Sequence, residues 1–62
     1  MTTRDVLKQL KADGWVKVGQ SGSHRQFKHP TKPGKVTVAV HGMSDHMKAG
    51  TLASIKRQAG WE

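Results

Sequence analysis

The chain has 62 residues, which predicts one domain over residues 1–62, and it has no cysteine, which excludes disulfide bonds and thiolate metal sites. Eleven lysines and arginines against four acidic residues give a net charge of +7, which favours a polyanionic partner such as nucleic acid. The sequence has no segment with the pattern of a secretory signal, a membrane-spanning helix or a membrane-binding amphipathic helix, so we expect a cytoplasmic protein without membrane contact.

The first element in chain order is a helix over about residues 3–13. Thr2 and Asp5 form a pattern related to the capping box, and the apolar residues that follow recur at helical spacing. Gly14 stands where a glycine commonly ends a helix.

The helix is followed by a short strand and a turn. Residues 15–18 include β-branched residues, and apolar and polar side chains alternate from Val16 to Val18, a pattern that predicts a strand. Residues 19–23 have the composition of a turn.

Two more strands and a second helix follow. Residues 24–29 predict a strand whose one large apolar residue is Phe27, and residues 35–40 predict a strand with valines at alternate positions. Residues 48–59 predict a helix that ends before Gly60. The order predicts an α+β fold, α-β-β-β-α, in which a three-stranded antiparallel sheet has both helices on one face. This architecture is dsRBD-like, that is, similar to a double-stranded-RNA-binding domain.

The sheet face without helices is where the sequence predicts a functional site. If Phe27 belongs to the core, alternation along the strand places His24, Gln26 and Lys28 on the opposite, open face. A histidine beside groups that can hold phosphate fits proton transfer in RNA cleavage, but an exposed histidine without a role fits the pattern equally well. His41 follows on the same face, where it could position substrate, transfer a proton or be a loop residue.

The remaining histidines and the aromatic residues are expected to be structural or solvent-exposed. His29 and His46 are expected at the surface, and Trp15 and Trp61 are expected to seal the core and cap the last helix. His24 and His29 are five positions apart on one predicted strand, so their side chains would point to opposite faces. We therefore expect no metal site.

Motifs along nearly the whole chain resemble the HicA toxin family. They are Gly14-Trp15, Gly22-Ser23-His24, Phe27, the strand end at Val40-His41, and Gly50-Thr51-Leu52 with Gln58-Ala59-Gly60. The resemblance implies a dsRBD-like fold, cleavage of mRNA, a catalytic histidine at His24 and neutralisation by a HicB-like antitoxin. We expect such an antitoxin to cover the open sheet face around His24.

Together these features predict an mRNA interferase, a metal-independent endoribonuclease that needs no cofactor. His24 would take the proton from a ribose 2′-OH that attacks the adjacent phosphate, and His41, a lysine or water would protonate the leaving oxygen. The residues expected to contact RNA are Ser23, Gln26, Lys28 and Lys48. The alternatives are a non-catalytic RNA-binding module of the same fold and a domain whose charge matches an acidic protein partner.

Overall fold

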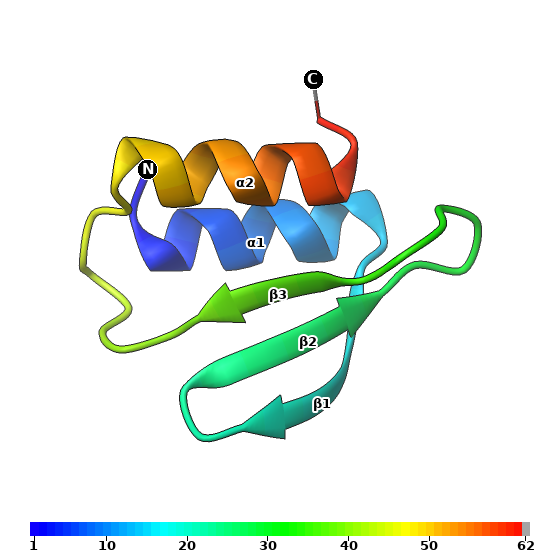
Figure 1. Ribbon diagram of the computed structural model, residues 1–62, viewed down its shortest axis with the longest axis horizontal. Helices are drawn as coiled ribbons and strands as arrows, with labels where there is room; N and C mark the ends of the chain where they lie inside the picture. The colour runs from blue at the N-terminus through cyan, green and yellow to red at the C-terminus, as the bar shows by residue number, and fades with distance from the viewer. Residues whose placement is uncertain (62) are drawn as a thin grey trace.

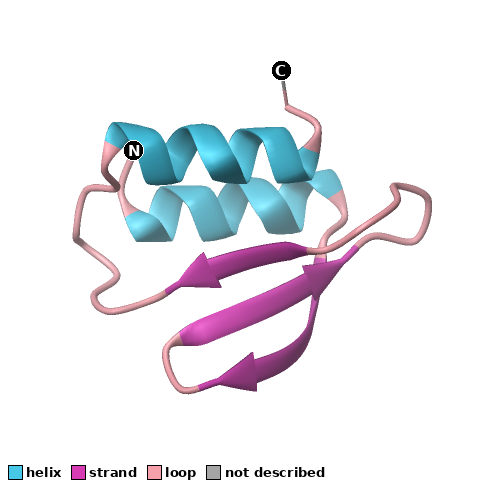
Figure 2. Cartoon of the chain, viewed as in Figure 1, coloured by secondary structure: helices cyan, strands magenta, loops and turns pink. Residues whose placement is uncertain are grey.

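The computed structural model describes residues 1–61 and contains two helices and one antiparallel sheet. The element order is α1 (Thr3–Asp13), β1 (Val16–Ser21), β2 (His24–Lys28), β3 (Val36–Ala39) and α2 (Ala49–Ala59). The strands are ordered β1-β2-β3, so β2 is central, and both helices lie on one side of the sheet (Figure 1, Figure 2). This confirms the predicted dsRBD-like α+β fold.

Local capping chemistry fixes the ends of α1. The Thr2 hydroxyl accepts a hydrogen bond from the Asp5 N–H at 3.2 Å, and the Asp5 carboxylate accepts one from the Thr2 N–H at 3.1 Å. These two bonds make a complete capping box, and the hydrogen bond from the Thr2 N–H lowers the pKa of the Asp5 carboxyl. Gly14 ends the helix with a φ of 100°, a left-handed conformation that glycine adopts without steric cost.

The second helix begins one residue later than the sequence predicts. Lys48 has the extended φ of −65° and ψ of 148° of an N-cap residue, so it lies outside α2. Gly60 ends α2 as predicted. Within residues 1–61, neither helix combines the length and the apolar character that crossing a membrane requires.

The first strand is longer than the sequence predicts. Residues 19–21, expected to be part of a turn, continue β1, and the turn shrinks to two residues at positions 22 and 23. The ladder with β2 holds this polar segment extended, and a β-bulge between Lys17 and Gly19 shifts its register. Conversely, β2 ends at Lys28 and β3 at Ala39, each one residue earlier than expected, and β3 begins one residue later.

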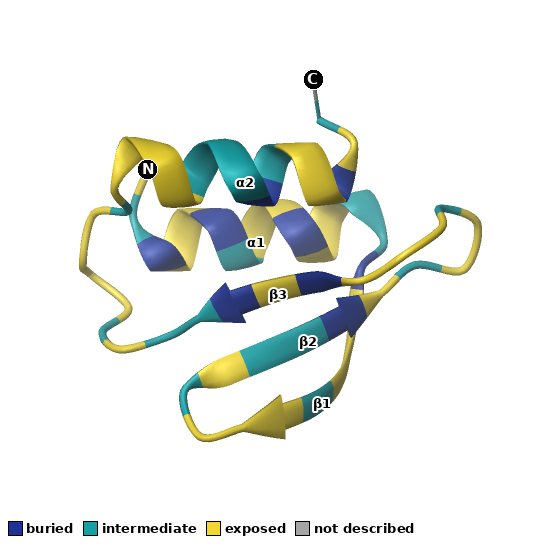
Figure 3. Cartoon of the chain, viewed as in Figure 1, coloured by how far each residue is buried: buried dark blue, intermediate teal, exposed yellow. Residues whose placement is uncertain are grey.

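The core lies between the helices and the sheet. Its eight buried apolar residues are Val6, Leu10, Trp15, Phe27, Val36, Val38, Ile55 and Ala59. Figure 3 shows buried segments in both helices, in β3 and at the end of β2. The burial of Phe27 confirms that the neighbouring positions on β2 face away from the helices, which leaves the other side of the sheet open.

Candidate functional site

His24 is the first residue of the central strand. The two-residue turn before it contains Gly22, with a φ of 58°, and Ser23, whose carbonyl accepts a hydrogen bond from the Val40 N–H at 2.7 Å. That bond ties the turn to the end of β3 and so fixes the backbone that carries His24. The His24 side chain is exposed. The ring is therefore attached to a well-held backbone and remains accessible to a ligand.

Three side chains of β2 form a line on the open face, which we call the open-face row. It consists of His24, Gln26 and Lys28, which alternate with the inward-facing Arg25 and Phe27. Successive members of the row are roughly 7 Å apart, because a strand rises about 3.4 Å per residue. The row therefore presents an imidazole, an amide and an ammonium group along one line.

The cross-strand neighbours of His24 and Gln26 are small, whereas Lys28 is paired with Val16. His24 lies between Ser21 on β1 and Ala39 on β3, and Gln26 lies between Gly19 and Thr37. Residues paired across strands share a sheet face, so none of these neighbours rises above the row. His24 and Lys28 are exposed and Gln26 is half-buried, so an extended polymer can reach the imidazole and the ammonium of the row.

The other two predicted positions, His41 and Lys48, lie together at a different place. They line a cleft of about 360 Å³ between the end of β3 and the start of α2, which we call the α2 cleft. Ala39, which pairs with His24, also lines this cleft, so the cleft borders the open-face row without containing His24. His46 is exposed as predicted, and it too lines the α2 cleft, a placement that no local pattern in the sequence indicates.

His29 is not the simple surface residue that the sequence predicts. Its Nε2 lies 2.6 Å from the Asp13 carbonyl oxygen, and its Nδ1 accepts hydrogen bonds from the backbone N–H groups of Thr31 and Lys32, both at 3.1 Å. Since Nδ1 accepts, the ring proton is on Nε2 and is donated to Asp13. The ring also packs edge-on against Trp15, with centroids 5.2 Å apart. His29 therefore joins the β2–β3 loop to the end of α1.

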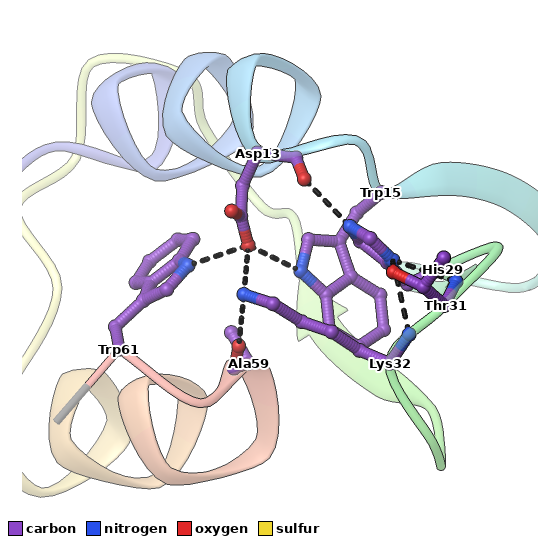
Figure 4. A network of polar contacts seen from close by, with 7 residues as sticks. All are labelled: Asp13, Trp15, His29, Thr31, Lys32, Ala59 and Trp61. Carbon is purple, nitrogen blue, oxygen red and sulfur yellow. Dashed lines mark hydrogen bonds and ion pairs between the residues drawn. The ribbon is translucent and has the colours of Figure 1, made fainter.

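Asp13 is the centre of this structural network, which Figure 4 shows. Its Oδ2 accepts hydrogen bonds from Lys32 Nζ at 2.6 Å, Trp15 Nε1 at 3.0 Å and Trp61 Nε1 at 3.1 Å. The Lys32 ammonium first, then the indoles of Trp61 and Trp15, lower the pKa of the Asp13 carboxyl from 3.8 to about 2. Lys32 also donates to the Ala59 carbonyl at 3.2 Å. These contacts join the C-terminal ends of both helices to the β2–β3 loop, at the opposite end of β2 from His24.

The fold and the open-face row define a class: a small basic dsRBD-like domain that carries a histidine at the head of its central strand. The sequence model of a family described as "HicA toxin of bacterial toxin-antitoxin" matches residues 3–61, so the chain belongs to the HicA toxin family. Membership makes the chain the toxin of such a system and implies an antitoxin partner. No curated protein sequence matches the chain.

Proposed function

We propose that this toxin is a metal-independent endoribonuclease that cleaves mRNA, with His24 as its catalytic residue. The observation that supports the proposal is the position of His24. The side chain is exposed on the face of the sheet opposite the helices, in line with Gln26 and Lys28, and its cross-strand neighbours are small. A polynucleotide laid along β2 would meet a proton-transfer group and a cation in succession.

The chemistry uses a nucleophile that belongs to the substrate. His24 takes the proton from a ribose 2′-OH, the 2′ oxygen bonds to the adjacent phosphorus, and the bond from phosphorus to the 5′ oxygen breaks. The products are a 2′,3′-cyclic phosphate and a 5′-hydroxyl, and the leaving oxygen takes its proton from His41, a lysine or water. Tethering of the 2′-OH next to the phosphate supplies several kcal/mol of the barrier.

The remaining members of the row would hold the phosphate. The Lys28 ammonium is a mobile point charge that can neutralise a phosphate, and the Gln26 amide can donate a hydrogen bond to a phosphate or a base. The net charge of +7 would attract RNA over the whole surface, because phosphate contacts dominate nucleic-acid affinity. Ser23, which directly precedes His24, and Lys48, which lines the α2 cleft with Ala39, would extend the contact beyond the row.

A substrate with a single 2′-deoxy sugar at the cleaved position tests the proposal. We expect it to bind almost as well as the all-ribose RNA and to resist cleavage by several orders of magnitude. A binding module without catalytic activity would leave both substrates intact. Equal cleavage of both substrates would make water the nucleophile and contradict the role given to His24.

Addition of EDTA tests whether the reaction is independent of metal ions. The cleavage rate should stay unchanged, whereas loss of activity in EDTA would show that cleavage depends on a metal ion.

A further inference from the structure

A second cleft lies on the helix side of the sheet, at the β1 edge. It has a volume of about 330 Å³, and we call it the β1 cleft. Leu7 of α1 forms part of its lining together with the buried aromatic side chains of Trp15 and Phe27. Arg25 and Phe27 alternate with His24 along β2, so this cleft is on the opposite side of the sheet from the proposed catalytic residue.

The charged residues that line the β1 cleft are all positive. They are Lys11 of α1, Lys17 of β1 and Arg25 of β2, and no aspartate or glutamate among residues 1–61 lines the cleft. The Arg25 Nε is buried and has no hydrogen-bond partner among the residues that the structure describes. A buried donor without an acceptor is destabilising, and a guanidinium binds carboxylates especially well because its N–H groups match both oxygens. The cleft therefore favours an occupant that brings a negative charge.

The lining also distinguishes a protein from a nucleic acid. Protein interfaces combine apolar and aromatic centres with polar surroundings, and the β1 cleft combines Trp15, Phe27 and Leu7 with three cations. RNA cleaved at His24 would lie on the other side of the sheet. Membership in a toxin–antitoxin family supplies a protein partner, the antitoxin.

We propose that the β1 cleft is an anchoring site for the antitoxin, which inserts an apolar side chain beside an aspartate or glutamate. The apolar side chain contacts Trp15 and Phe27, and the carboxylate pairs with the guanidinium of Arg25, which lines the cleft. The proposal depends on family membership and not on ribonuclease activity. Because His24 is on the opposite face, this contact contributes to affinity and does not itself block the proposed catalytic residue.

The test is the dissociation constant of the complex between the toxin and the antitoxin encoded beside it. Arg25→Gln removes the guanidinium, and Lys17→Gln removes an exposed charge at the rim. Lys35→Gln and Arg57→Gln are matched controls that each remove one exposed charge elsewhere. We expect the dissociation constant to rise at least about tenfold for Arg25→Gln, since truncating one partner of a desolvated charge pair is costly. Lys17→Gln should slow association and reduce its salt dependence.

Activity measurements on the same variants separate anchoring from inhibition and from RNA binding. Both cleft variants should cleave RNA as the controls do, and saturating antitoxin should still inhibit them completely. Antitoxin affinity equal to that of the controls would overturn the proposal. RNA binding that is weaker than in the controls, with antitoxin affinity unchanged, would assign the cleft to RNA instead. Because affinity is measured directly, these outcomes stand even if the toxin proves to have no ribonuclease activity.

Discussion

Ser21 on β1 lies directly opposite His24 on β2, and Ala39 on β3 is the partner of His24 on its other side. Both partners have small side chains on the same sheet face as the imidazole. The ring is therefore accessible from both flanks, and its accessibility depends on the size of two residues that carry no catalytic chemistry.

A larger side chain at position 21 should hinder cleavage without unfolding the protein. Ser21→Leu places a branched side chain beside His24, and displacing a substrate by about 1 Å can reduce the rate by roughly a hundredfold. Because Ser21 is exposed, stability should change by less than about 0.5 kcal/mol. Gln9→Leu is the matched control, since Gln9 is exposed on α1, away from the open sheet face. Unchanged cleavage by Ser21→Leu would place the substrate elsewhere.

Substitution of Gly14 by alanine should destabilise the protein more than the same substitution of Gly60. A Cβ at Gly14 would lie 2.9 Å from His29 Nε2 and would also require a φ of +100°. A Cβ at Gly60 has no neighbour within 4 Å, so Gly60→Ala introduces only the strain of its φ of +72°. We expect about 1 kcal/mol of destabilisation for Gly60→Ala and roughly 2–3 kcal/mol for Gly14→Ala, measured by urea denaturation. Equal losses would mean that the His29 ring does not restrict this position.

Asp13→Asn should destabilise the protein in a pH-dependent manner. Folding lowers the pKa of Asp13 from 3.8 to about 2, so its ionised form stabilises the fold above about pH 3.8. That contribution is lost as the pH falls through about 2. The variant should therefore be less stable than the wild type at neutral pH, and the difference should shrink as the pH falls from about 3.8 towards 2.

Denaturation curves collected between pH 2 and 7 measure this difference. Asp45→Asn makes the same change at an exposed position and serves as the control. A gap between wild type and Asp13→Asn that stays constant over this range would show that the Asp13 charge does not stabilise the fold.

The sequence predicted the elements whose signals are local. The capping pattern of Thr2 and Asp5 and the stop at Gly14 placed both ends of α1, and alternation from Phe27 placed His24, Gln26 and Lys28 on the open face. The extension of β1 was missed because residues 19–21 resemble a turn, and only pairing with β2 holds them extended.

The Asp13 network was missed for a related reason. Its partners lie up to 48 positions apart in the chain, and nothing local marks His29 or Lys32 as members. The sequence offered one signal for this network. Buried indole N–H groups need acceptors, so the two tryptophans called for a nearby acceptor such as the aspartate that precedes Gly14. The α2 cleft likewise depends on how the β3–α2 loop folds over Thr3.

RNA affinity should fall steeply as the salt concentration rises. Each phosphate neutralised on a single strand contributes a slope of about −0.7 to a plot of log affinity against log salt. Lys28→Gln should reduce the magnitude of the slope by about 0.7, the contribution of one phosphate. Lys35 lies outside the open-face row, so Lys35→Gln should reduce the slope less. A wild-type affinity that does not depend on salt would show that the positive charge does not bind RNA.

Cleavage of RNA by the folded His24→Ala protein tests the central claim most directly. The matched control is His46→Ala, which removes another exposed imidazole, and thermal melting of both variants establishes that they are folded. We expect His46→Ala to retain most of the wild-type cleavage rate. His24→Ala should lose about two to four orders of magnitude, the range attributed to a general base, and should no longer inhibit growth. Wild-type cleavage by folded His24→Ala would contradict the assignment of His24 as the catalytic residue.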